Sequence, residues 1–467
     1  MKKQALIFSV LIVAFAAVMT IISSCGKSTE TTVIAVPYFS VGQSVSAGNI
    51  SGSVKGTMKA DSVYYVTGDI TINKGDTLVI QPGVKVYFKG LYSFIVRGNL
   101  LSLGSKDKPI YFTVQGQTKL DNPCQDPTTD PAYQGMWGGI LGDTTTQFMI
   151  IKWTHVEFGC GILATSPVPG IKNASPAYMI SFVNPQGIFV LEDSWVYGGV
   201  DDPIRIQGGK VHLMRNTFEK GGFLGGEGFN IKSGTVGNIA YNLFVGESTG
   251  AIKPSNNGGK NPQTEIVAYN NTILNGGYRR NAPGRGASIN YEEGSKGKFY
   301  NNLIVNCKFG PRIVGTGNYS GNALVIADTA NIFYGYNWQY GDSASVTNQF
   351  YPVGFLTKPT STDYPAPAFL QAGYKLGDIY DGTSLVGKND PQFVNYSFPR
   401  TGALACIAYV TGFDFHLKST SPCLGKGTTS FTLLSNVPVD PNFGATEITA
   451  PGLDMGCYQS NGKGNQH

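Results

Sequence analysis

Short units in which asparagine precedes apolar residues recur along the middle of this chain, and they constrain its fold more than any other feature. One unit is "YNNTILNGG" at 269–277, and related text recurs before and after it. Asp193 takes the leading position of an earlier unit, and Thr154 of one before that. From Asp193 onward the steps are 23, 26, 29, 31 and 20 residues. The leading asparagines are Asn216, Asn242, Asn271, Asn302 and Asn322.

This spacing indicates a stacked-repeat fold. A minimum in the low twenties suggests one turn of about 20 residues, with loops of varying length inserted at a fixed point. Glycine supplies 61 of the 467 residues, and charged residues are only 14%, so β structure is favoured over helix. The units therefore predict an all-β solenoid, a parallel β-helix. An antiparallel sandwich with Asn and Gly only in its turns is the alternative, which the shared register of the units disfavours.

The repeated asparagine is expected to act at the bend between two strands of a coil. Asparagine tolerates the left-handed backbone region that a sharp bend needs. Its amide can also stack on the same residue of the next coil and bond to it, as in other stacked β structures. The apolar residues that follow should then point inward in alternation.

The first 25 residues are typical of an export signal. Lys2 and Lys3 precede an apolar run at 5–22, and "ISSC" ends at Cys25. Small residues directly before a cysteine resemble a bacterial lipobox, which implies cleavage after residue 24 and lipidation of Cys25. An ordinary secretory signal or a membrane-spanning helix is the alternative. The lipobox predicts a bacterial outer-membrane lipoprotein, on the periplasmic or cell-surface side, held to the membrane by its lipid anchor alone.

The rest of the chain divides by composition. Residues 1–24 are the predicted signal peptide and 25–54 a tether that begins with the lipidated Cys25. Residues 55–460 form a single β-helix with terminal caps. A proline- and tyrosine-containing stretch at 331–389 is expected to be a loop-rich insertion before the last coil, and residues 461–467 a C-terminal tail.

Charge and cysteine content exclude some functions. The chain carries 35 basic and 30 acidic residues. Without the two signal-peptide lysines the balance is 33 against 30, or +3, which is too weak to indicate nucleic acid as a partner. Six cysteines remain besides Cys25, none in a CxxC pair or at zinc spacing. No dense acidic cluster indicates a Ca²⁺ site, so no cofactor is expected, although carboxylates of adjacent coils could form a Ca²⁺ site.

Both ends of the predicted helix resemble one family. "GDTLVIQPGVKVYFKG" (75–90), "FIVRGNLLSLGSKDKPIYFT" (94–113) and "GMWGGI" (135–140) resemble the opening coils of right-handed parallel β-helix lipoproteins of the pectin-lyase-like superfamily, especially those of Bacteroidetes. "DPQFVN" (390–395), "FDFHLKSTSPCLGKGT" (413–428) and "LDMGCYQ" (453–459) resemble the family's closing coil. The resemblance implies a right-handed β-helix. It does not select a function, because the fold hosts lyases, hydrolases, epimerases and adhesive stalks.

One departure from that family concerns two cysteines. Cys423 and Cys457 stand where such proteins often carry small residues. They are expected to form either a disulfide bridge or two buried thiols.

Alignment of the segments after the Gly-rich turns predicts a basic groove. If Ile206, Ile231, Ile252, Ile289 and Ile313 share one inward column, Lys232 and Lys253 stand side by side about 4.8 Å apart on the outer face. Arg205 lies on the same sheet, and the loop at 276–286 adds Arg279, Arg280 and Arg285. The alternative is a solvated face whose lysines separate and pair with Glu227 or Glu292.

Such a groove suits an acidic polysaccharide. In a polysaccharide lyase, Lys253, with Lys232 beside it to lower its pKa, would act as the base, and an arginine would neutralise the uronate. A hydrolase needs placed carboxylates, and Asp201–Asp202 is the acidic pair near the column.

A second candidate surface is the aromatic stretch "YGYNWQYGD" at 334–342. In an extended strand Tyr334, Tyr336, Trp338 and Tyr340 would face one side and offer a sugar-stacking row, with Tyr336 and Trp338 central. The alternative is a patch packed on the helix surface.

Two functions therefore stay open: a monomeric, non-catalytic or adhesive lipoprotein that binds a glycan, and a polysaccharide lyase acting on uronic acids.

Overall fold

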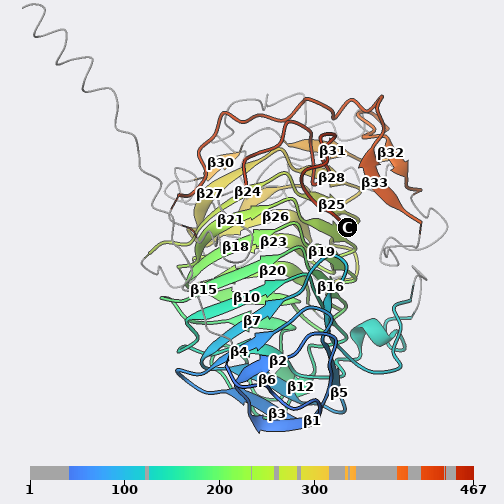
Figure 1. The fold of residues 1–467 in the computed structure, drawn as a ribbon. Coiled ribbons are helices and arrows are strands. Elements are labelled where there is room, and N and C mark those ends of the chain that lie inside the picture. Colours follow the sequence, from blue (N-terminus) through green and yellow to red (C-terminus); the bar gives the residue numbers. More distant parts are fainter. Residues whose placement is uncertain are drawn as a thin grey trace, which may run out of the picture.

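The fold is a parallel β-helix, as the recurring units predict. The computed structural model describes residues 42–120, 126–223, 225–232, 234–256, 262–280, 286–314, 332–334, 337–342, 387–397, 412–435, 437 and 449–467. Within them, strands of successive coils pair in parallel with the coils before and after. Figure 1 shows the coils stacked from the N-terminal end to the C-terminal end of the helix. A single short 3-10 turn, η1 (Pro131–Tyr133), is the one helical element of the described part.

Three parallel sheets form the walls of the helix. The ten-stranded first sheet comprises β2 (Gly56–Met58), β4 (Thr77–Ile80), β7 (Asn99–Leu103), β10 (Phe148–Lys152), β15 (Ile188–Glu192), β18 (Lys210–Met214), β21 (Val236–Ala240), β24 (Glu265–Tyr269), β27 (Lys296–Tyr300) and β30 (Ile332–Tyr334). The second sheet comprises β5 (Lys85–Phe88), β8 (Ile110–Thr113), β11 (Thr154–Glu157), β16 (Trp195–Tyr197), β19 (Thr217–Glu219), β22 (Leu243–Val245), β25 (Thr272–Leu274), β28 (Leu303–Val305) and β31 (Trp338–Tyr340). The third comprises β6 (Ser93–Val96), β9 (Gly139–Gly142), β14 (Ile180–Phe182), β17 (Ile204–Gln207), β20 (Glu227–Lys232), β23 (Gly250–Pro254), β26 (Ala287–Glu292) and β29 (Arg312–Val314).

The N-terminal coils connect the second and third sheets. The long strand β3 (Val63–Ile72) pairs with β5 through its first half and with β6 through its second half. Before it, β1 (Gly48–Ser53) pairs with β3, so part of the predicted tether belongs to the stack. Two short strands, β12 (Ile162–Leu163) and β13 (Ser175–Pro176), form an antiparallel pair outside the three sheets.

The predicted asparagine ladder is present at the turn between the first and second sheets. The amide Nδ2 of Asn242 donates to Oδ1 of Asn271 at 2.9 Å, and Asn271 donates to Asn302 at 2.9 Å. Each Nδ2 also donates to a backbone carbonyl, as Asn271 does to Ile239 at 3.1 Å. Asn216 begins the series and Asn337 ends it, whereas the predicted Asn322 lies outside the described residues. The ladder therefore satisfies buried polar groups along the whole turn.

Two details of the ladder prediction were wrong. The ladder position before Asn216 belongs to Ser194 and not to Asp193, because the backbone N–H of Ser194 donates to Asn216 Oδ1 at 3.1 Å. One coil earlier, the backbone N–H of Thr154 donates to Ser194 Oγ at 3.1 Å. The left-handed residue is the one before each ladder residue, for example Tyr241 at φ 56°. The asparagine amide thus bonds between coils while its neighbour makes the bend.

The main apolar core fills the inside of the helix with residues from most strands of the three sheets. A second core lies on the outer face of the second sheet, where Leu243, Val245, Leu274, Leu303 and Val305 are at most 1% exposed. The C-terminal segment covers them with Phe393, Phe415, Cys423, Met455, Cys457 and Tyr458. Figure 1 shows this red segment running beside the upper coils.

The end of the chain differs from the expected last coil. Within the predicted insertion at 331–389, β30 and β31 are regular strands of one more coil, and residues 343–386 lie outside the described part. After residue 390, β32 (Phe393–Asn395) and β33 (Asp414–Leu417) pair antiparallel, apart from the stack. The predicted tail at 461–467 packs on the second sheet, since Asn465 Nδ2 donates to the carbonyls of Asn216 and Tyr241, each at 3.2 Å.

Candidate functional site

The outer face of the third sheet arranges the predicted basic residues differently from the sequence alignment. Arg205 pairs in register with Asn230, and Asn230 with Lys253. Lys232 pairs with Gln207, so it stands two residues away from the register position of Lys253. The expected side-by-side lysine pair is therefore wrong. Ile231 pairs with Pro254, and Ile252 pairs with Phe229, which places one error between β20 and β23. Ile313 pairs with Tyr291 and not with Ile289, which places a second error between β26 and β29.

Each lysine instead has a carboxylate partner, which confirms the pairing that the alternative interpretation predicted, but the face is largely buried and not solvated. Lys253 Nζ lies 2.6 Å from Glu227 Oε1, and the two side chains are each 7% exposed. Lys232 Nζ lies 3.1 Å from Glu292 Oε1. Burial lowers the pKa of Lys232, although Glu292 opposes the change.

Two adjacent aspartates at the entrance to β17 complete this cluster. Asp202 Oδ1 accepts the backbone N–H of Glu227 at 3.0 Å, and Asn230 Nδ2 donates to Asp202 Oδ2. Burial raises the pKa of Asp202 well above its ordinary value, and the Glu227 carboxylate raises it further. Burial and Glu227 also raise the pKa of Asp201. Crowded carboxyl groups in a buried place favour protonation of one of them.

Glu247, in the turn after β22, is a fourth carboxyl group of this region that the sequence interpretation missed. Its side chain is 1% exposed, and neither oxygen forms a well-shaped hydrogen bond with a described residue. Burial raises the pKa of Glu247 to about 8, although Arg279 and the backbone of Gly221 oppose the rise. The available signal was its position, because Glu247 follows Gly246 directly at the end of a strand, where a coil turns toward the third sheet.

The arginines predicted to line the groove are largely engaged by the protein itself. Arg279 donates to the carbonyls of Gly222 at 3.0 Å and Gly221 at 2.8 Å, and its guanidinium lies 5.1 Å from the centre of the Tyr133 ring. Arg280 lies close enough to Asp201 to oppose the rise of its pKa.

The remaining arginines differ in how far the structure describes them. Arg205 Nη1 is 3.7 Å from Asp202 Oδ2, and the Arg205 side chain is 25% exposed. Arg285 lies outside the described residues. We define the turn cluster as Asp201, Asp202, Arg205, Glu227, Asn230, Lys232, Glu247, Lys253, Arg279 and Arg280.

The predicted aromatic row does not lie on one strand. Tyr334 belongs to β30 in the first sheet, and Trp338 and Tyr340 belong to β31 in the second sheet. Trp338 Nε1 donates to the carbonyl of Asn389 at 2.8 Å. Trp338 and Tyr340 both pack against the second core. Tyr336 lies outside the described residues. The packed-patch alternative describes Trp338 and Tyr340.

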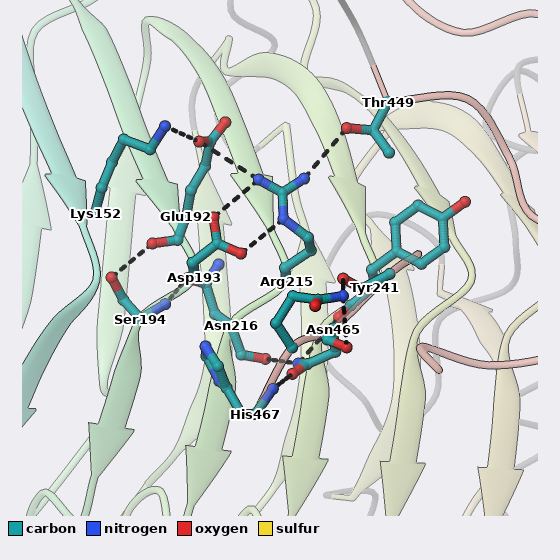
Figure 2. Close-up of polar contacts among 12 residues, drawn as sticks. Lys152, Glu192, Asp193, Ser194, Arg215, Asn216, Tyr241, Thr449, Asn465 and His467 are labelled. Carbon is teal, nitrogen blue, oxygen red and sulfur yellow. Dashed lines mark hydrogen bonds and ion pairs between the residues drawn. The ribbon is translucent and has the colours of Figure 1, made fainter. Parts of the chain in front are cut away.

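A second buried charge cluster lies at the turn that carries the ladder (Figure 2). Lys152 Nζ is 2.8 Å from Glu192 Oε2, and His212 Nε2 is 2.6 Å from Oε1. Arg215 binds Asp193 through both carboxylate oxygens, with Nε at 2.7 Å and Nη2 at 2.9 Å. Burial alone would raise the pKa of Glu192, but His212, Lys152 and Arg215 outweigh it and hold the pKa well below its usual range. We call these five residues the ladder cluster.

The C-terminal segment closes over the ladder cluster. Arg215 Nη1 donates to Thr449 Oγ1 at 3.3 Å. The ring of His467 stacks on Trp195 with centroids 3.8 Å apart, and Thr217 Oγ1 lies 2.9 Å from His467 Nδ1. Figure 2 shows Thr449, Asn465 and His467 along one side of the cluster. The charged groups of the ladder cluster are paired with one another and covered by the C-terminal segment, so we interpret the cluster as a structural element.

The other predicted positions divide between described and undescribed residues. Cys423 and Cys457 are buried free thiols, and burial raises the pKa of each to about 12, so they are not bridged. Cys25 lies outside the described residues. In the described part, no group of three or more His, Cys, Asp or Glu side chains is arranged to hold a metal ion. A helix long and apolar enough to cross a membrane is likewise absent from that part.

Comparison with known proteins adds little to the site. No family model matches the chain, and no solved structure matches it. A stretch of 93 residues, 20% of this chain, is 30% identical to Protein bark beetle of Drosophila melanogaster. The chain covers 3% of that protein's length.

Proposed function

We propose that this chain is a lipid-anchored protein of the bacterial outer membrane whose β-helix binds an acidic polysaccharide at the turn cluster without cleaving it. The supporting observation is the charge balance created by burial. At neutral pH Glu247 is mostly protonated because its pKa is about 8, and the raised pKa of Asp202 favours its protonated form. The five cations of the turn cluster then exceed by one the described carboxylates left in it or beside it, which are Asp201, Glu227 and the two acidic neighbours of Lys232, Glu292 and Glu293. This small excess gives a local field that attracts a polyanion.

The geometry of the third sheet suits an extended chain. Arg205, Asn230 and Lys253 succeed one another in a single register column, at about 4.8 Å per coil. Arg205 and Lys232 are the partly exposed members, with side chains 25% and 12% exposed. A polyuronate lying across the coils would meet these two cations first.

Binding of polygalacturonate to the purified protein tests this function. We expect binding that weakens as salt rises, because exposed charges are screened over about 8 Å at physiological ionic strength, and no comparable binding of a neutral glucan. The double variant Arg205→Ala, Lys232→Ala should lose most of this binding. Lys296→Ala is the matched control, since Lys296 pairs with Glu265 at 3.0 Å on the first sheet. Equal binding of the neutral glucan, or an unchanged double variant, would refute the proposal.

Lyase activity is a second candidate, favoured by the lowered pKa of Lys232, which brings this amine closer to the range of a general base. The Lys253 ammonium is hydrogen-bonded to the Glu227 carboxylate at 2.6 Å and its side chain is 7% exposed, so it is poorly placed to take a proton from a substrate. Absorbance of unsaturated uronate products, followed in the same binding mixtures, separates the candidates. A signal that disappears in Lys232→Ala would establish the lyase.

The lipid anchor has its own test. If Cys25 is acylated, Cys25→Ser should move the protein from the membrane fraction to the soluble envelope fraction. A variant that stays with the membrane would indicate an uncleaved apolar helix at 5–22 instead.

A further inference from the structure

An ion pair outside the two charge clusters is almost completely buried. Lys220 directly follows β19, and its Nζ lies 2.7 Å from Oδ2 of Asp130, with the two side chains 3% and 1% exposed. The other oxygen of Asp130, Oδ1, accepts the backbone N–H of Ala132 at 2.9 Å, at the start of η1. Within the described residues, Asp130 is the one hydrogen-bonding partner of the Lys220 ammonium. Two full charges are thus held out of water with few other groups to stabilise them, which is costly.

Lys220 also occupies a backbone position that lysine rarely adopts. Its φ is 56°, in the left-handed region, which disfavours residues with a Cβ atom. The same position, directly after a strand of the second sheet, is left-handed in other coils, where it holds Phe158, Gly198, Gly246, Asn275 and Asn306. Glycine and asparagine suit this backbone, and lysine does not. A charged side chain therefore stands here in spite of both its burial and its backbone, which points to a requirement for its amine.

We propose that Lys220 and Asp130 condense in the folded protein to form an isopeptide bond, an amide between Lys220 Nζ and Asp130 Cγ. The reactants are already in contact, and Cγ is one bond beyond the oxygen that Nζ touches, so little further orientation is needed. The amide is neutral, so its formation removes two buried charges. The pair stands beside an apolar cluster that contains Tyr197, whose pKa is raised by burial and further by Asp130. This apolar environment favours neutral groups.

The reaction needs only the groups of the pair and the Ala132 N–H. A proton passes from the Lys220 ammonium to Asp130 Oδ2, which leaves a neutral amine with a free electron pair. Nζ attacks Cγ and forms the new N–C bond, while the negative charge that develops on Oδ1 is stabilised by the Ala132 N–H. A second proton passes from Nζ to Oδ2, the Cγ–Oδ2 bond breaks, and water leaves. The two protons and the oxygen of that water all come from the pair, so no other reactant is consumed.

The bond would fasten the turn after β19 to the segment that carries η1, two parts of the chain 90 residues apart in sequence. Arg279 contacts both parts, through the carbonyls of Gly221 and Gly222 and through the ring of Tyr133. An isopeptide bond therefore fixes the surroundings of one turn-cluster residue covalently. A cross-link across so long a segment also restricts the unfolded chain and so stabilises the fold. The inference goes beyond glycan binding and does not depend on it.

Peptide mapping of the purified, folded protein by mass spectrometry tests this inference. Trypsin should release peptide 120–152, which contains Asp130, joined to peptide 216–232, which contains an uncut Lys220. The mass of the joined product should be smaller than the sum of the two peptides by one water. Lys220→Arg, which keeps the positive charge but has no amine that can condense, should give the two peptides separately.

The Lys108–Asp61 pair is the internal control, since it has the same 2.7 Å contact but side chains 56% and 58% exposed, and it should remain unlinked. Two results would overturn the inference. One is separate peptides with trypsin cleavage after Lys220 in the parent, and the other is linkage of Lys108 to Asp61 to the same extent, which would exclude burial as the cause. Both are measured on the parent, so the outcome does not depend on how well the variant folds. Failure here leaves the polyuronate proposal untouched, because glycan binding is measured separately with its own variants.

Discussion

The ladder cluster and the turn cluster differ in how their carboxyl groups are compensated. In the ladder cluster, the Glu192 carboxylate is 1% exposed and faces Lys152, His212 and Arg215, and its pKa is held well below the usual range. In the turn cluster, burial and crowding raise the pKa of Asp202 and raise that of Glu247 to about 8. Ion pairs within the fold compensate Glu192, whereas Asp202 and Glu247 are incompletely compensated, as is frequent at functional sites. Within the ladder cluster Asp193 is an exception, because burial raises its pKa although Arg215 opposes the rise.

The two clusters also occupy different kinds of turn. Asp193 and Arg215 directly precede the ladder residues Ser194 and Asn216, at a short turn of constant length. The turn cluster lies at the connection between the second and third sheets. In the neighbouring coils this connection varies from four residues between β22 and β23 to twelve between β25 and β26. A constant turn fixes partners from coil to coil, while a variable turn can change its side chains without disturbing the stack.

The largest expected effect is on the ladder cluster. Glu192→Gln should destabilise the protein by about 3–5 kcal/mol, because it leaves buried cations without their carboxylate. Urea unfolding at neutral pH measures the change. Glu265→Gln on the same sheet is the control, since the Glu265–Lys296 pair is about 30% exposed and should contribute at most about 1 kcal/mol. Equal effects of the two substitutions would mean that the buried ion pairs of Glu192 stabilise the fold no more than the partly exposed Glu265–Lys296 pair does.

Removing a carboxyl group from the turn cluster should have the opposite effect on the free energy of unfolding. The pKa of Glu247 is raised from 4.5 to about 8 in the folded state, so the native protein binds more protons than the unfolded chain between these values. Stability must then fall as pH rises from about 4.5 to about 8 and level off above it. Glu247→Gln should remove this slope and stabilise the protein at pH 8 by on the order of 3 kcal/mol.

Unfolding free energies of parent and variant across that pH range measure the difference. A parallel pair of pH profiles would contradict the raised pKa of Glu247. Ionisation of Glu247 adds a negative charge to the turn cluster, so polygalacturonate binding by the parent should also weaken above pH 8.

The ladder was predictable from sequence because every coil repeats the same local geometry. Asn242, Asn271 and Asn302 bond the same kind of partner one coil away. The same need for an amide at the turn therefore recurs at regular places in the sequence. The register of the third sheet was not predictable in the same way. Alternation has a period of two, so a slip of two residues between β20 and β23 keeps every side chain on its expected face. Phe229 and Ile231 both point inward, and the isoleucine pattern alone could not choose which one pairs with Ile252.

The second core could have been predicted from the sequence, because some strands of the second sheet lack the usual alternation of apolar and polar residues. In β19 the polar residues Thr217 and Glu219 flank Phe218, and this alternation gives no sign of a cover, although Thr217 is buried beneath His467. In β22 all three residues, Leu243, Phe244 and Val245, are apolar and buried. Strands that are apolar on both faces require a cover, and the C-terminal segment provides it. The buried carboxyl groups gave no such signal, because their pairing depends on loops whose path the repeats do not determine.

A substitution in the asparagine ladder should change stability without changing glycan binding. Asn271→Leu should destabilise the stack by about 1–3 kcal/mol, because the backbone N–H and carbonyl groups that its amide serves lose their partner. Its substitution should leave the affinity for polygalacturonate unchanged, since the amide bonds Asn302 and Ile239 and no member of the turn cluster. An unchanged melting temperature would remove the energetic role assigned to the ladder.

The smallest expected effect concerns the closure of the ladder cluster by the C-terminal segment. Thr449→Val removes the hydroxyl that accepts from Arg215 Nη1 at 3.3 Å, and it should cost about 1 kcal/mol. Part of that cost is general packing, so the informative quantity is its coupling to Arg215. In a double-mutant cycle with Arg215→Met, the Thr449→Val substitution should have almost no further effect, because its partner is already gone. Additive losses in urea unfolding would mean that the C-terminal segment covers the cluster without bonding to it, and the contrast with the turn cluster would then rest on Glu192 and its three neighbours.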